Sequence, residues 1–141
     1  MNTLKSLDGG VIFEYDSLVG SNLSHLDLRC ADLEGADLEW SDLEGANLRR
    51  ANLRNANLYF SNLRNADLRS ADLRGANCQR ALMVGTRLDD AQLDGTDFGG
   101  AMIEKSGGTV PLMVRSSIRL AIRVILRVSI FRIRRFFKRP S

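Results

Sequence analysis

The chain of 141 residues has few of the residues that build catalytic or metal centres. It contains one histidine, His25, and two cysteines, Cys30 and Cys78. Two cysteines are too few for a disulfide framework, and their spacing fits no metal-binding motif. A lone histidine without partner residues is a weak signal for a catalytic base or a metal ligand. Phosphate-binding loops, nucleophile elbows and zinc motifs are also missing, so we expect no enzyme, no cofactor and no metal.

Long apolar runs are missing as well, and no secretory signal is expected. No uncharged apolar run approaches the length that spans a bilayer, and the first ten residues are polar. With so few cysteines, a reducing compartment is expected, so the protein is predicted to be cytoplasmic.

Acidic residues are missing from the last quarter of the chain. Residues 1–105 hold 17 acidic and 11 basic side chains, whereas residues 106–141 hold nine basic side chains and no acidic one. This asymmetry predicts a body and a separate basic tail.

A five-residue repeat fills residues 21–105. Successive units read ADLEG (31–35), ADLEW (36–40) and SDLEG (41–45), and seventeen units fit this frame. All seventeen centres are apolar, and the eleven from Leu23 to Leu73 are leucine. The residue two places before each centre is small, except Leu26.

A period of five suits neither an α-helix nor a straight strand. On a helix, successive leucines would lie about 140° apart and cover every face. On a strand, an odd period sends successive leucines to opposite sides. A chain that turns a corner after each unit buries them all, with the centre and the small residue pointing inward and the other three outward.

A second period of twenty residues indicates four sides per coil. Ser21, Ser41 and Ser61 replace alanine at this interval, and Trp40 and Phe60 are also twenty residues apart. The motif resembles that of the pentapeptide-repeat family, A-(D/N)-L-x-x. The resemblance implies an all-β fold, a right-handed quadrilateral β-helix of about four coils and roughly 20 Å in length.

Three segments are therefore expected. Residues 1–20 form an N-terminal cap with a short strand at Val11–Phe13, in which Val11 or Phe13 packs on the first coil. Residues 21–105 form the β-helix. Residues 106–141 form the basic tail, which is expected to be helical because Arg115, Arg119, Arg123 and Arg127 recur every four residues.

Most polar residues of the repeat have structural roles in this interpretation. The Asp or Asn before each centre is expected to bond to local backbone at the turns. Cys78 occupies a centre and points inward, whereas Cys30 points outward on another side, so no bond between them is expected.

Two sets of outward residues are candidate interaction surfaces. Arg29, Arg49 and Arg69 are twenty residues apart and would form a column, which is either a solvated face balanced by acids of neighbouring sides or a patch for an anion or partner. Trp40, Tyr59 and Phe60 would lie together on one side, either as a contact surface or covered by the N-terminal strand or the tail.

The tail is a third candidate, for attachment to an anionic surface such as a membrane. Its basic residues alternate with apolar ones in a pattern that favours an interfacial segment over a spanning one. The alternatives are that the tail packs on the rod, pairs with a second copy, or is an unselected extension. Its basic residues are Arg115, Arg119, Arg123, Arg127, Arg132, Arg134, Arg135, Lys138 and Arg139.

These features predict a non-enzymatic structural or protein-interaction module with an unidentified protein partner, and they leave a homodimer open. Sequence-specific nucleic-acid binding is not expected. The alternative comes from the family, some members of which resemble duplex DNA and block a type II topoisomerase. Such mimicry needs a continuous anionic surface, and seven arginines from Arg49 to Arg80 interrupt it.

Overall fold

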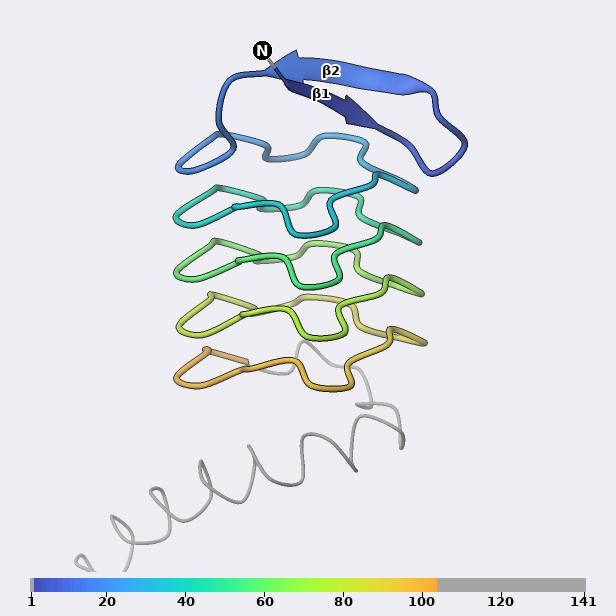
Figure 1. The fold of residues 1–141 in the computed structure, drawn as a ribbon. Helices are drawn as coiled ribbons and strands as arrows, with labels where there is room; N and C mark the ends of the chain where they lie inside the picture. The colour runs from blue at the N-terminus through green and yellow to red at the C-terminus, as the bar shows by residue number, and fades with distance from the viewer. Residues whose placement is uncertain (1, 104–141) are drawn as a thin grey trace, which may run out of the picture.

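The computed structural model describes residues 2–103, which form an N-terminal β-hairpin and a rod of stacked coils (Figure 1). The hairpin consists of β1 (Asn2–Lys5) and β2 (Val11–Tyr15), which pair antiparallel. No helix occurs within residues 2–103. The tail from residue 106 onward lies outside the described residues, so its expected helix stays a prediction.

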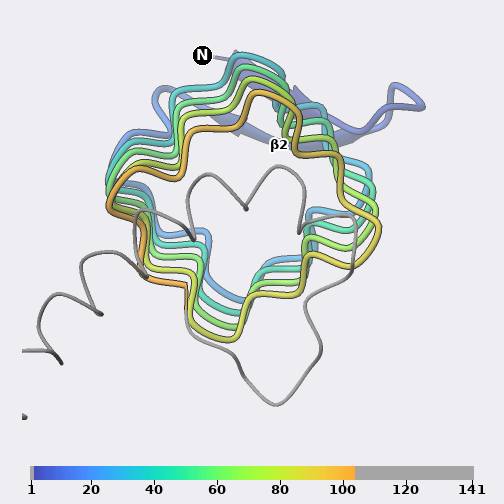
Figure 2. The same ribbon diagram turned by 90° about the horizontal axis from the view of Figure 1, so that it is seen from below.

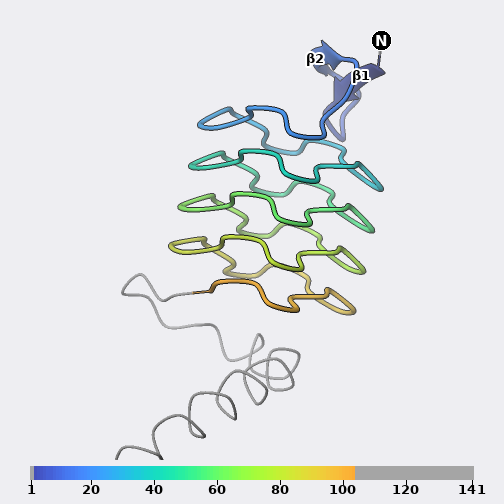
Figure 3. The ribbon, with the colours of Figure 1, turned by 90° about the vertical axis from the view of Figure 1, so that its left-hand side faces the viewer.

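Each coil of the rod contains twenty residues. Parallel backbone bridges join residues that are twenty apart, from Asn22 and Asp42 at one end to Leu82 and Met102 at the other. Seen along the axis, the coils superimpose in a four-sided outline (Figure 2), and from the side they stack one beneath the next below the hairpin (Figure 3). The predicted β-helix with four five-residue sides per coil is thereby confirmed.

Each side of the rod ends in a tight turn that the five-residue unit builds. In one unit, the N–H of Ala56 donates to the carbonyl of Leu53 at 3.1 Å, and Asn55 between them has a φ of 55°. A type II turn requires this left-handed backbone at its third residue, and asparagine tolerates it. The N–H of Arg54 also donates to the side-chain oxygen of Asn52 at 3.3 Å. The predicted turn-forming role of the Asp and Asn residues is thus confirmed.

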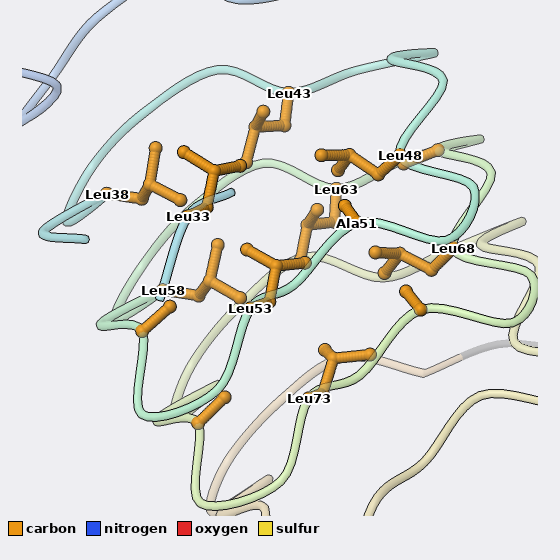
Figure 4. Close-up of a cluster of buried hydrophobic side chains, with 14 of the residues drawn as sticks. Leu33, Leu38, Leu43, Leu48, Ala51, Leu53, Leu58, Leu63, Leu68 and Leu73 are labelled. Carbon is orange, nitrogen blue, oxygen red and sulfur yellow. The ribbon is translucent and has the colours of Figure 1, made fainter. Parts of the chain in front are cut away.

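The leucine centres fill the interior of the rod, as Figure 4 shows for three successive coils. The leucine centres from Leu28 to Leu73 are fully buried, and most of the alanines two places earlier are buried beside them, whereas Leu88 is only partly buried. Burying one such leucine stabilises the fold by about 1.5–3 kcal/mol. Two of the serines that replace alanine, Ser41 and Ser61, are buried too, and they donate their hydroxyls to backbone carbonyls three residues earlier at 2.7 and 2.8 Å. Each buried hydroxyl therefore keeps a hydrogen bond.

The N-terminal cap is a two-stranded hairpin and not the single strand predicted around Val11. Leu4 of β1 is buried in the core, and the end of β1 bonds to the first coil, where the N–H of Asp32 donates to the carbonyl of Lys5 at 2.7 Å. Phe13 of β2 packs against the core as predicted, but Val11 is 65% exposed. The prediction that Val11 or Phe13 packs inward is therefore met by Phe13, and a register shift between Leu4 and Lys5 breaks the alternation of β2 and leaves Val11 outside.

The coil geometry begins one unit before residue 21. Leu18 is buried in the position of a centre, Gly20 has the left-handed φ of 65°, and the N–H of Ser21 closes the turn on the carbonyl of Leu18. The N–H of Gly20 also bonds to the carbonyl of Glu39 in the next coil at 2.8 Å. Residues 17–20 thus extend the rod toward the hairpin.

Candidate interaction surfaces

A column of residues runs along the outside of the rod on one side, and we call it the aromatic column. Its members, in order from the hairpin end, are Gly20, Trp40, Phe60, Arg80 and Gly100. The rings of Trp40 and Phe60 stack with centroids 4.4 Å apart and an interplanar angle of 4°. The guanidinium of Arg80 lies 5.3 Å from the centre of the Phe60 ring. The spacing of neighbouring β-strands, about 4.8 Å, suits this stacking, so the twenty-residue coil itself brings the three side chains into contact.

Tyr59 extends the aromatic column sideways. Its ring meets that of Phe60 edge to face, with centroids 4.7 Å apart. The predicted grouping of Trp40, Tyr59 and Phe60 is therefore confirmed, although the sequence reasoning did not include Arg80. Trp40 remains 57% exposed, so the N-terminal segment does not cover it. The tail, which was the other segment expected to cover Trp40, lies outside the described residues, so this alternative stays a prediction.

The arginine column contains Arg29, Arg49 and Arg69 on another side of the rod. Arg29 and Arg69 each form a salt bridge with the aspartate two residues earlier in the same unit, at 2.6 and 2.5 Å. The unit of Arg49 has Asn47 in place of that aspartate, and Arg49 has no ion pair within residues 2–103. We expected acids of neighbouring sides to balance this column. The acids that pair with Arg29 and Arg69 instead belong to the same five-residue units as these arginines.

These pairs shift the ionisation of their members. Hydrogen bonding to the Arg69 side chain lowers the pKa of Asp67, and hydrogen bonding to Arg74 does the same for the pKa of Asp72. The pKa of each arginine rises for the same reason. Because the pairs are partly exposed to solvent, which screens the charges, each is expected to contribute little to the stability of the fold.

Charge is arranged in bands along the rod. Residues 30–48, which we call the acidic band, hold six carboxylates and no basic residue, and none of the six forms a salt bridge with a described residue. Residues 45–66, the arginine band, hold no acid and the four arginines Arg49, Arg50, Arg54 and Arg64. Asparagine amides of the arginine band bond to carboxylates of the acidic band, such as Asn62 to Asp42 at 2.9 Å.

A groove of about 510 Å³ lies between the hairpin and the side that carries the arginine column. The sequence reasoning missed it because strand β1, which forms the hairpin with β2, was not predicted. Arg29 on its wall already pairs with Asp27, so Arg49 and Arg50 are the cations that lack an ion pair with a described residue. The groove is lined by Ser6, Asp8, Ile12, Asp27, Arg29, Cys30, Arg49 and Arg50.

Comparison with known protein families agrees with this geometry. The sequence profile described as Pentapeptide repeats matches residues 17–45, 31–69 and 71–106, with 8 copies. The chain belongs to the pentapeptide-repeat family. Proteins of this family fold as right-handed quadrilateral β-helices, in agreement with the four-sided coils of the rod.

Solved structures of pentapeptide-repeat proteins resemble this chain. A protein from the thylakoid lumen of Arabidopsis thaliana is 25% identical, with 72% of this chain and 73% of that chain covered and a TM-score of 0.61. Rfr23 from the cyanobacterium Cyanothece 51142 is 32% identical, with 60% and 54% covered and a TM-score of 0.33. QnrB1, a plasmid-mediated fluoroquinolone resistance protein, is 19% identical, with 63% and 54% covered and a TM-score of 0.33. No curated protein matches the chain.

The remaining polar candidates of this pentapeptide-repeat chain have packing roles. The ring of His25 lies 2.5 Å from the point where a Cβ on Gly45 would stand, so it fills a corner that glycine leaves free. Cys78 is buried at a centre, and burial raises the pKa of its thiol to about 12. Cys30 is half-buried, and both cysteines are free thiols. Within residues 2–103, no group of three or more metal-ligating side chains comes together.

The nine basic residues of the tail lie outside the described residues, so the structure does not test the attachment predicted for them. Within residues 2–103, no helix of the length and apolar character needed to cross a bilayer was found.

Proposed function

We propose that the rod is a protein-binding module whose contact surface is the aromatic column. The observation that carries this proposal is the stack of Trp40, Phe60 and Arg80, together with the 57% exposure of Trp40. Aromatic residues and arginine dominate the energetics of protein interfaces. Because the three side chains already hold one another in place, a partner would bind them without ordering them first.

The fold supports binding more than catalysis. Successive coils hold the outward side chains in rigid columns, while the interior is filled by leucine and alanine. Proteins of the pentapeptide-repeat family are generally structural or binding modules. In this proposal the chain displays side chains at fixed spacing for binding and catalyses no reaction.

The basic tail contributes a second contact in this proposal, with an anionic surface such as a membrane. The supporting observation is its composition: nine basic residues and no acid from residue 106 to the end. Each basic side chain near an anionic leaflet contributes about 1 kcal/mol. The full chain should float with anionic vesicles and not with neutral ones. Attachment that does not change with vesicle charge contradicts this part of the proposal.

Inhibition of a type II topoisomerase by DNA mimicry is the less favoured function. A mimic needs negative charge along its whole length, whereas the arginine band places four arginines and no acid across the middle of the rod. We expect no inhibition in a supercoiling assay with the purified chain. Inhibition at micromolar concentration would establish the alternative.

Comparative affinity capture tests the protein-binding proposal. The tagged full chain, the variant Trp40→Ala/Tyr59→Ala and the control Arg54→Ala are used as baits in extract from the organism that encodes the chain. Arg54 is exposed on another side and makes no salt bridge with a described residue. We expect one set of proteins to be retained by the first and third baits and lost by the second. Identical sets from all three baits would contradict the proposal.

A further inference from the structure

One face of the Trp40 indole is open. Phe60 covers the other face at 4.4 Å, yet 57% of the surface of Trp40 is exposed. The residue before Trp40 in the aromatic column is Gly20, which has no side chain to lie over the indole. A Cβ on Gly20 would meet no heavy atom within 4 Å in the part of the chain that the structure describes. There is consequently room above Trp40 for a side chain that this chain does not supply from Gly20.

At the other end of the stack, the ring of Phe60 is in contact with a guanidinium. Phe60 has Trp40 on one side, and the guanidinium of Arg80 lies 5.3 Å from its ring centre. A guanidinium is planar, so it stacks on aromatic faces, and it is attracted by the negative electrostatic potential that the ring quadrupole creates over each face. Tryptophan is the strongest acceptor for this contact, and its open face offers the contact that Arg80 makes with Phe60.

The charge around Trp40 favours a cation on this face. Trp40 lies within the acidic band, whose carboxylates have no ion pair among the described residues. The nearest is Glu39, whose Oε1 accepts the indole N–H at 2.9 Å. Glu39 Oε2 has no hydrogen-bond partner within residues 2–103. A guanidinium on the open face would therefore meet both the ring and an adjacent carboxylate.

We propose that the open face of Trp40, with Glu39 beside it, binds an arginine side chain from a basic segment of a partner protein. The inference rests on the proposed protein-binding function and specifies the chemistry of the partner. Arginine is favoured over lysine because a planar group stacks on the indole while it pairs with a carboxylate. The acidic band would hold the other basic residues of the segment near Trp40.

Fluorescence of Trp40 gives a direct readout because it is the only tryptophan of the chain. The full chain is titrated with a Gly-Arg-Gly-Arg-Gly peptide, with its lysine counterpart, and with a peptide in which the neutral isostere citrulline replaces arginine. The arginine peptide should change the emission in a saturable way. The lysine peptide should bind about fivefold to tenfold more weakly, and the citrulline peptide should cause no change. Equal responses to the arginine and lysine peptides, or no response, would overturn the proposal.

A substitution at Gly20 tests whether the open face is the site. Arg50 and Arg80 occupy equivalent corner positions with φ of 58° and 57°, so an arginine is compatible with that backbone. Gly20→Arg should place the chain's own guanidinium over Trp40 and abolish the response to the arginine peptide. Gly20→Ser is the control and should keep the response, since Ser70 occupies such a corner with a φ of 57°. Undiminished binding by a folded Gly20→Arg variant would show that the site lies elsewhere.

A pair of charge variants separates a site at Trp40 from general attraction to the acidic band. Glu39→Gln keeps an acceptor for the indole N–H but removes the charge, and Glu34→Gln removes the same charge on the adjacent side. Glu39→Gln should weaken binding of the arginine peptide severalfold more than Glu34→Gln does. Equal effects would mean that only the net charge of the band attracts the peptide, and the proposed site would then be wrong.

The peptide titration and the affinity capture together distinguish failure of the arginine site from failure of the proposed binding function. If the arginine peptide fails but Trp40→Ala/Tyr59→Ala still loses partners in affinity capture, the binding function stands and the arginine assignment falls. The chain's own basic tail is the other occupant to exclude. A Trp40 that acrylamide quenches only at high salt would show that the tail occupies the face, and this would overturn the assignment to a partner.

Discussion

Asn52 donates its side-chain amide to the carboxylate of Asp32, its neighbour one coil earlier, at 2.9 Å. Asn57 bonds to Asp37 and Asn62 to Asp42 in the same way, at 2.9 Å each. Along each side of the rod, no aspartate follows directly on another aspartate at this position. The choice between Asp and Asn within the repeat therefore prevents like charges from stacking about one strand spacing apart.

Replacing Asn52 by aspartate should destabilise the rod. Asn52→Asp would place three carboxylates in a row, at positions 32, 52 and 72, and would remove an amide donor. Each like-charge contact costs about 0.2–1 kcal/mol, so we expect a loss of about 0.5–2 kcal/mol in the free energy of unfolding. Urea denaturation measures it, and added salt should reduce the loss because it screens the charges.

Asn77→Asp is the matched control for that change. The coil neighbours of Asn77 are Asn57 and Asp97, so this variant creates one like-charge contact and not two. At low salt, Asn77→Asp should lower the free energy of unfolding by less than Asn52→Asp does. Equal losses at low salt, or losses that do not depend on salt, would count against repulsion along the column.

The hairpin should stabilise the rod through Leu4. Leu4 is 2% exposed and belongs to the core, so Leu4→Ala should lower the free energy of unfolding by about 2–5 kcal/mol. Val11, on the neighbouring strand, is 65% exposed, and Val11→Ala should change it by no more than about 0.5 kcal/mol. Thermal melts of both variants compare these effects, and a Leu4→Ala variant as stable as Val11→Ala would refute the role of the hairpin as a cap.

The two cysteines should differ in reactivity. Cys78 is fully buried and its pKa is raised to about 12, so its thiol stays protonated and inaccessible at neutral pH. Cys30 is half-buried at a corner of the rod. Titration with a thiol reagent should detect one thiol per chain in the native protein and two in denaturant. Two fast-reacting thiols in the native protein would contradict the inward position of Cys78.

Acid should destabilise the rod through its paired aspartates. The folded-state pKa values of Asp67 and Asp72 are lowered, so their contribution is present above the unfolded-state pKa of about 3.9. It is lost as the pH falls through that value toward the lower folded-state values. The melting temperature should therefore hold down to about pH 5 and fall below about pH 4.

The variant Asp67→Asn/Asp72→Asn isolates this effect, because asparagine still accepts the turn hydrogen bond. Its melting temperature should be lower than that of the unchanged chain at neutral pH and should fall less steeply in acid. Two parallel pH profiles would mean that other groups cause the acid loss.

The sequence predicted the parts of the fold that a strict period determines. A centre every five residues fixed which side chains point inward, and the spacing of Trp40 and Phe60 correctly placed them in neighbouring coils. The same reasoning applies to Cys78, which takes a leucine position and is buried like one. These predictions needed only the repeat, since each unit meets the same neighbours as the next.

The parts that the sequence did not reveal depend on contacts outside the repeat or on side-chain geometry. Strand β1 has four residues, of which only Leu4 is a large apolar one, so no periodic signal marks it. The stacking of Arg80 on Phe60 follows from the twenty-residue period, but a period alone does not show that a flexible side chain folds over a ring. The pairing of Arg69 with Asp67 likewise required the observed rotamers.

The buried leucine centres are expected to be the main source of the rod's stability, which leaves the outward columns free for binding. The most direct measurement compares thermal melts of Leu53→Lys and Arg54→Ala, two adjacent positions of one unit, by far-UV circular dichroism. Leu53 is fully buried in a dry core, where an unpaired ammonium costs several kcal/mol, whereas Arg54 is exposed. We predict no cooperative melt for Leu53→Lys and a melt close to that of the unchanged chain for Arg54→Ala. A cooperative melt of Leu53→Lys near the unchanged melting temperature would contradict the account.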